Sequence, residues 1–120
     1  MKNAPGSTHD ERKGLYSLGS ASDSIHGDLV NGKPYWIKGW TEVSTYPPSG
    51  IWFDSKYGNW KIGNEGNIGK TSGNMFSYSA DNFFGPHGVT KWKYSKDGKW
   101  NIDNNGDIIV IMAGTMFIKI

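Results

Sequence analysis

One short segment contains the three residue types of a hydrolytic triad. In SDSIHGD, Ser24, His26 and Asp28 stand at alternate positions, which would place their side chains on one face of a strand. Nucleophilic catalysis also requires an oxyanion hole and a base fixed next to the nucleophile, and alternate positions of one strand rarely provide them. We therefore predict that this cluster is not catalytic and that the protein is not an enzyme.

Two groups of residues resemble metal ligands, and both are incomplete. His9, His26 and His87 are far apart in the sequence, without the close spacing of histidines that bind zinc together. The segment NIDNNGDI is similar to the start of an EF-hand loop, but Met112 stands where the final glutamate is required. A hairpin turn built on Asn-Gly explains the same residues. We expect no metal ion and no other cofactor.

Large aromatic residues in two stretches outside the repeated segments are the best candidates for a binding site. The stretches are 38–50 and 77–88, and the candidate ligand-binding residues in them are Trp40, Tyr46, Phe83, Phe84 and His87. Flat apolar rings stack on sugar faces, while neighbouring Asn, Asp and Ser groups hydrogen-bond to hydroxyls. For the loops themselves, the favoured interpretation is that they fold back as lids over the ends of the domain, and a ligand surface is the alternative.

The composition favours an all-β protein of one domain. The chain has 120 residues with 6 Trp, 6 Tyr and 5 Phe, so aromatic rings must supply much of the core. The 17 glycines argue against helices, because glycine costs about 1 kcal/mol relative to alanine in a helix interior. A net charge of +2, with lysines spread along the chain, does not favour nucleic-acid binding.

The sequence also limits the cellular context. We find no apolar run long enough for a membrane span and no signal peptide, so no membrane association is expected. The absence of cysteine removes disulfides and thiolate metal sites. These features leave the compartment open.

Two segments of the chain repeat one another. WFDSKYGNWKIGNEGNI (52–68) and WKYSKDGKWNIDNNGDI (92–108) are identical at nine of seventeen positions without a gap. This predicts an internal repeat of about 40 residues, with units at about 32–72 and 73–113 and a closing strand at 114–120. Residues 1–28 have no counterpart and are expected to form a partly ordered arm, in which Leu15, Tyr16 and Leu18 add an edge strand.

The second copy predicts a hairpin with a definite register. A three-residue loop, Lys96-Asp97-Gly98, pairs Tyr94 with Trp100 and Trp92 with Ile102, so that both tryptophans enter the core. By the same reasoning Trp52, Trp60 and Ile62 share one face in the first copy, while Ile108 pairs with Ile102 after the next turn. Together these hairpins predict roughly seven to nine strands in a single small antiparallel barrel or sandwich, with a β-trefoil as the alternative.

The hairpin motifs also resemble a known module. The runs NGKPYWI, IWFDSKYGNWKIG and WKYSKDGKW, within residues 29–102, are similar to a small tryptophan-rich β module of large extracellular or surface proteins of marine animals and algae. That module often has a Cys-Pro step where this chain has Gly85-Pro86. The resemblance implies an extracellular binding or structural module without an assigned activity.

The sequence therefore predicts a non-enzymatic binding module, with carbohydrate bound through the loop aromatics. The alternative is a structural or protein-interaction domain that has no small-molecule ligand. Expected partners are a glycan or a protein surface, and the expected state is a monomer or a weak homodimer.

Overall fold

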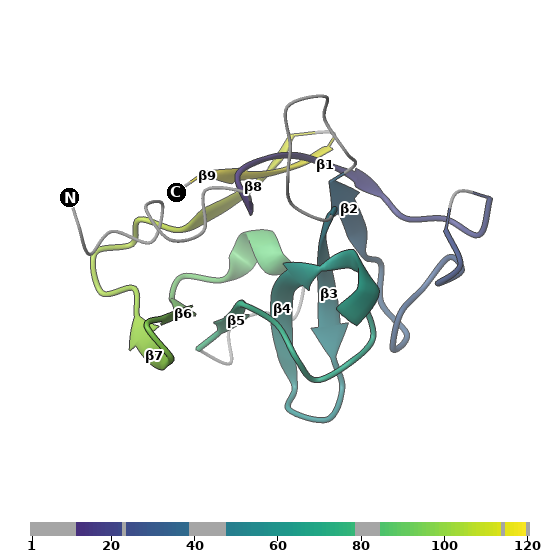
Figure 1. The fold of residues 1–120 in the computed structure, drawn as a ribbon. Coiled ribbons are helices and arrows are strands. Elements are labelled where there is room, and N and C mark those ends of the chain that lie inside the picture. Colours follow the sequence, from purple (N-terminus) through teal and green to yellow (C-terminus); the bar gives the residue numbers. More distant parts are fainter. Residues whose placement is uncertain (1–11, 23, 39–47, 79–84, 114, 120) are drawn as a thin grey trace.

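The structure is a curled sheet of short strands (Figure 1). The computed structural model describes residues 12–22, 24–38, 48–78, 85–113 and 115–119. The strands are β1 (Gly14–Leu18), β2 (Trp36–Lys38), β3 (Ser49–Asp54), β4 (Asn59–Asn64), β5 (Met75–Ser77), β6 (Trp92–Lys96), β7 (Lys99–Ile102), β8 (Ile109–Ala113) and β9 (Thr115–Lys119). The connections contain two 3-10 turns, η2 (Glu65–Asn67) and η3 (Pro86–Gly88). Within these ranges, no helix has the length and apolar character to span a membrane.

The strand order explains the curl. Neighbouring strands pair antiparallel in the order β7-β6-β5-β4-β3-β2-β1-β9-β8. The strands β7 and β8 follow one another in the chain but lie at the two ends of this order, and the sheet curls into a half-barrel. This confirms the predicted all-β class with antiparallel, barrel-like architecture. The order of the described strands gives no support to the β-trefoil alternative.

The strand β1 lies inside the sheet. We expected residues 14–18 to add an edge strand from an N-terminal arm, but β1 pairs with β2 on one side and β9 on the other. Tyr16 is fully buried in the core, and its hydroxyl donates a hydrogen bond to the Arg12 carbonyl oxygen at 2.7 Å. The expectation of an edge strand was therefore wrong, because one buried tyrosine and two long-range pairings hold this segment in place.

The concave face of the sheet carries the main core. Its buried members include the aromatic residues Tyr16, Trp36, Trp60, Trp92 and Tyr94, together with Ile51, Ile62, Met75, Val89, Ile108, Val110, Met116 and Ile118. A second cluster of Val30, Tyr35, Trp52 and Ile68 lies on the other side of β3. Aromatic rings fill both clusters, as the composition predicts, since a ring buries more apolar area than an aliphatic side chain.

The hairpin of β6 and β7 has a different register from the predicted one. Ser95 pairs with Trp100 and Lys96 with Lys99, so the loop is the two-residue turn Asp97-Gly98. Both loop residues have positive φ, 53° and 74°, as a type I′ turn requires. A shift of one residue reverses the face of every side chain on a strand. Trp100 consequently points away from the core, and its side chain is 51% exposed.

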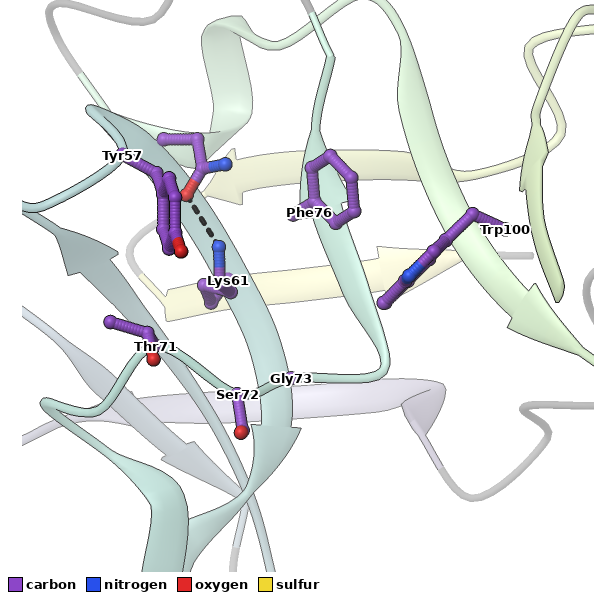
Figure 2. A pocket seen from close by; sticks show the side chains of 8 residues that line it. Tyr57, Lys61, Thr71, Ser72, Gly73, Phe76 and Trp100 are labelled. Carbon is purple, nitrogen blue, oxygen red and sulfur yellow. Dashed lines mark hydrogen bonds between the residues drawn. The ribbon is translucent and has the colours of Figure 1, made fainter. Parts of the chain in front are cut away.

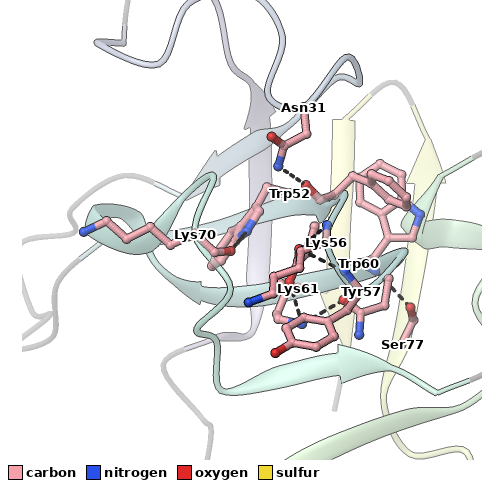
Figure 3. Close-up of polar contacts among 11 residues, drawn as sticks. Asn31, Trp52, Lys56, Tyr57, Trp60, Lys61, Lys70 and Ser77 are labelled. Carbon is pink, nitrogen blue, oxygen red and sulfur yellow. Dashed lines mark hydrogen bonds and ion pairs between the residues drawn. The ribbon is translucent and has the colours of Figure 1, made fainter.

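The hairpin of β3 and β4 has a longer loop. Asp54 pairs with Asn59 across four loop residues, and its Oδ1 accepts hydrogen bonds from the backbone N–H groups of Lys56 (2.9 Å) and Tyr57 (3.3 Å). Trp52 donates its indole N–H to the Lys70 carbonyl oxygen at 3.0 Å (Figure 3). The partner of Trp52 across the strands is Lys61, whereas the core residue Trp60 is paired with Phe53. The expected common face for Trp52 and Trp60 was therefore wrong.

The chain leaves β7 without forming the third strand of a meander. The side chain of Asp103 accepts hydrogen bonds from the backbone N–H groups of Asp107 (3.1 Å) and Ile108 (2.7 Å), which turns the chain toward the far edge of the sheet. There β8 pairs with β9. The expected pairing of Ile108 with Ile102 is wrong, and the internal repeat is not confirmed as a structural repeat.

Candidate functional site

Four of the five residues predicted to bind a ligand belong to segments outside the part of the chain that the structure describes. Trp40, Tyr46, Phe83 and Phe84 lie outside the described residues. His87 is described and is exposed in η3. The prediction for these loops therefore stays a prediction.

The structure reveals a groove that the sequence did not predict. It encloses a cavity of about 360 Å³ on the side of the sheet opposite the main core (Figure 2). Its lining residues are Tyr57, Asn59, Lys61, Thr71, Ser72, Gly73, Phe76 and Trp100. We refer to this site as the groove.

Strand pairing brings three distant parts of the chain to the groove. Lys61 on β4 pairs with Phe76 on β5, so both side chains point to the same side of the sheet. The register of β6 and β7 adds Trp100 to that side, and the loop before β4 adds Tyr57. The segment 71–73 completes the wall.

Aromatic rings form both shoulders of the groove. The Phe76 and Trp100 rings are 4.8 Å apart between centroids and meet edge to face at 70°. Tyr57 lies on the opposite side and is 61% exposed (Figure 2). Two large rings thus remain open to solvent although the fold buries most of its other described tryptophans and tyrosines.

A buried ion pair fixes the floor. The Lys61 Nζ lies 3.2 Å from the Asp54 Oδ2 and donates a hydrogen bond to the Asn59 Oδ1 at 2.7 Å. The same ammonium group is 5.3 Å from the centroid of the Tyr57 ring and 5.1 Å from that of Phe76. Both charged side chains of the pair are buried, and a buried charge of this kind is stable only when paired and hydrogen-bonded.

The connection between β4 and β5 is held by a buried arginine. The guanidinium of Arg12 donates hydrogen bonds to Asn64 Oδ1 (2.7 Å), Asn74 Oδ1 (2.8 Å) and Ser49 Oγ (2.7 Å). Asn64 and Asn74 stand at the two ends of the connection that supplies the groove wall. A Cβ at Gly73 would lie 3.1 Å from Lys61 Cδ, so glycine allows this wall to pass close to the floor.

Several polar groups of the groove are available to a ligand. Within the described structure, the Thr71 and Ser72 hydroxyls and the Asn59 amide nitrogen have no hydrogen-bond partner. The carboxylate of Asp54 is already engaged, because it forms the ion pair with Lys61 and accepts a hydrogen bond from the loop. The described groove thus offers rings, hydroxyls and an amide to a ligand.

The residue types of the triad have local structural partners. Ser24 Oγ accepts a hydrogen bond from the His26 backbone N–H at 3.1 Å, and Asp28 Oδ1 accepts one from the Ala21 N–H at 2.8 Å. The His26 ring packs edge to face on Tyr35 at 6.0 Å. In the described ranges, no group of three or more His, Cys, Asp or Glu side chains is arranged to hold a metal ion.

Comparison with known proteins finds no family model, no curated protein and no solved structure that matches this chain.

Proposed function

We propose that this protein is a non-enzymatic carbohydrate-binding module and that the groove is its binding site. The observation that carries the proposal is the pair of exposed rings, Tyr57 and Trp100, on either side of a cavity of about 360 Å³. Sugar rings present C–H faces that stack on aromatic rings and hydroxyls that need hydrogen-bond partners. Asn59, Thr71 and Ser72 supply such partners.

The rigidity of the groove supports the same function. The floor is fixed by the ion pair of Lys61 with Asp54, and the wall is anchored through Arg12. A site that is already formed loses little conformational entropy when a ligand binds. The loop residues Trp40, Tyr46, Phe83 and Phe84 remain a second proposed contact region, and the extracellular placement implied by the resemblance remains a proposal.

A glycan array followed by calorimetry tests this function. The expected result is binding of at least one oligosaccharide, reduced about fivefold or more in Trp100→Ala and in Tyr57→Ala, because one stacked ring contributes about 1 kcal/mol or more. Leu18→Ala removes an equally exposed apolar side chain on β1 and is the matched control. Loss of binding in Trp40→Ala with full binding in Trp100→Ala would move the site to the loops. Flat isotherms across the array would contradict carbohydrate binding altogether.

A second candidate function is self-association through β8. This edge strand has no described partner on its outer side, carries no charged residue, and exposes Ile109 and Ile111. Its pairing continues an apolar stripe through Phe117 to the exposed Leu15. The other edge, β7, carries Lys99, and an edge lysine opposes strand pairing.

The proposed occupant of this edge is a second copy of the chain, paired antiparallel around Ile111. That arrangement places no like charges together and extends both apolar stripes. Sedimentation velocity over a concentration series is expected to show a dimer that Ile111→Lys abolishes and Trp100→Ala does not. A monomer at every concentration would contradict this candidate.

A further inference from the structure

We propose that the groove selects acidic oligosaccharides, which carry carboxylate or sulfate groups, over neutral ones. This inference rests on the proposed function and names the class of its ligand. It follows from an excess of lysine ammonium groups held against the aromatic rings of the groove and its rim.

Three lysines stand over three rings along this face. Lys61 Nζ lies over Tyr57 and Phe76, as described above. On one flank, Lys56 Nζ is 5.5 Å from the Tyr57 ring centroid. On the other flank, Lys93 Nζ is 4.8 Å from the ring centroid of Tyr78 and 5.7 Å from that of Phe76.

These positions follow from the strand register. Phe76 pairs with Lys61 on one side and Lys93 on the other, so lysines and rings alternate across β4, β5 and β6. Lysine stems lie along apolar surface while the ammonium group stays near solvent. The lysines therefore surround the aromatic surface on which a sugar would stack.

The charges of the three lysines are compensated unequally. Lys61 forms an ion pair with Asp54. In the described structure, neither the Lys56 nor the Lys93 ammonium group has a carboxylate within ion-pair distance, and both lie over aromatic rings. The face consequently carries two uncompensated positive charges, one on each flank of the groove.

An acidic sugar matches this pattern better than a neutral one. Its ring stacks on Tyr57 or Trp100, and its carboxylate or sulfate reaches an ammonium group at the rim. A charge pair beside a partly dry aromatic surface is stronger than the same pair in bulk water. Repeated acidic units along a chain can contact both flanks at once, because Lys56 and Lys93 stand on opposite sides of Phe76 and Lys61.

Single-stranded nucleic acid is the main competing ligand, since it also combines rings with phosphates. A net charge of only +2 for the whole chain is low for a protein that tracks a phosphate backbone. The two flanking charges suit a ligand with spaced acidic groups. The experiment below therefore includes an oligonucleotide.

Calorimetry with matched sugars tests the inference. The probes are hexamers of galacturonate, mannuronate and glucuronate, and the neutral hexamers of galactose, mannose and glucose. We expect at least one acidic hexamer to bind about tenfold more tightly than its neutral counterpart, and this advantage to shrink as NaCl rises from about 50 to about 500 mM.

Variants identify the charges responsible. Lys56→Gln combined with Lys93→Gln is expected to lower affinity for the acidic hexamer about tenfold while leaving any neutral binding unchanged. Lys119→Gln removes an exposed charge on β9 and is expected to change neither. Circular dichroism of the double variant verifies that the fold is retained.

The outcomes separate this inference from the proposed function. Equal or tighter binding of neutral hexamers, or an unchanged double variant, would overturn acidic selectivity while leaving carbohydrate binding intact. No binding of any hexamer would overturn acidic selectivity, and flat isotherms across the whole glycan array would overturn both. Binding of a thymidine decamer more tightly than every hexamer would also overturn both, in favour of nucleic acid.

Discussion

The two tryptophan hairpins share much of their sequence, yet tryptophans at corresponding positions of the two hairpins point to opposite sides of the sheet. In β3 and β4, Trp60 enters the main core and Trp52 lies on the other side. In β6 and β7, Trp92 enters the main core and Trp100 lies on the other side. The first tryptophan of one hairpin thus takes the role of the second tryptophan of the other.

Two sequence positions explain why the loops of the two hairpins differ in length. Asp54 accepts hydrogen bonds from the loop N–H groups and stabilises a four-residue loop, whereas Tyr94, its counterpart in the second copy, has no carboxylate. Asp97 replaces Tyr57 and adopts positive φ, which Asp tolerates better than Tyr. The two loops differ in length by two residues, so in both hairpins the two tryptophans point to opposite sides of the sheet. The pairing of β3 and β6 with their neighbours in the sheet decides which of the two enters the main core.

Trp52 and Trp100, which both face away from the main core, also differ in how far other residues cover them. Trp52 is enclosed on its side by Val30, Tyr35 and Ile68, so it contributes to a second core. Trp100 contacts Phe76 but remains half exposed beside the groove. A tryptophan that faces away from the main core is therefore available to a ligand only where no other segment of the chain covers it.

The largest expected effect is a difference in stability between the two tryptophans of the second hairpin. Trp92→Ala should lower the free energy of unfolding by about 4 kcal/mol, because it removes a fully buried ring. Trp100→Ala should cost only about 1 kcal/mol, since half of the ring is already in water. Urea denaturation measures both values. Equal losses would contradict the difference in facing.

The ion pair in the first hairpin is expected to have the next largest effect. Asp54→Ala leaves the Lys61 charge buried without its partner and removes the loop acceptor, at a cost of about 3 kcal/mol. The double variant Asp54→Asn with Lys61→Met should recover most of this loss, because no buried charge remains. Asp97→Asn, in the exposed turn of the other hairpin, is the control and should cost about 0.5 kcal/mol or less, because asparagine tolerates the positive φ of this position. A large loss in the double variant would argue against the ion pair as the cause.

The turn itself is expected to have a smaller effect. Asp97→Tyr places in the second loop the residue found in the first, and tyrosine at positive φ should cost about 1 kcal/mol. Chemical-shift changes in the amide spectrum should concentrate on residues 95–100. An increase in stability would indicate that the loop prefers the longer form of its counterpart.

The smallest expected effect is a pH dependence at Tyr94. Burial, followed by the negative charges of Asp103 and Asp107, raises the pKa of the Tyr94 hydroxyl above its ordinary value. A raised pKa in the folded state stabilises the fold below the ordinary tyrosine pKa, and this contribution is lost as pH rises through the folded value. Stability should thus fall above pH about 10, and less steeply in Tyr94→Phe. An identical slope in both proteins would exclude Tyr94 as the source.

The fold class follows from the sequence, but the register does not. Alternating aromatic residues and glycine-rich turns are sufficient to predict antiparallel strands. The choice between a two-residue and a three-residue loop at Asp97-Gly98 depends on a positive φ at Asp97, and an error of one residue there places Trp100 in the core. Treating Asp-Gly as a type I′ turn gives the correct face.

The groove was beyond local sequence reasoning for a different reason. Its residues come from one loop, the connection at 71–73 and three strands, and they meet only through long-range pairing. The position of β1 inside the sheet likewise depends on pairing with β9, about a hundred residues further along the chain. Neither arrangement produces a periodic pattern within one segment.

Fluorine NMR of protein labelled with 5-fluorotryptophan tests the central claim about Trp100 most directly. The chain has 6 Trp, and each resonance can be assigned by a Trp→Phe substitution. We predict that the Trp100 resonance shows a large shift between H2O and D2O. We also predict that it moves on addition of an oligosaccharide that the protein binds. The resonances of Trp52, Trp60 and Trp92 should do neither. A Trp100 resonance that is insensitive to both solvent and sugar would contradict its placement in an open binding groove.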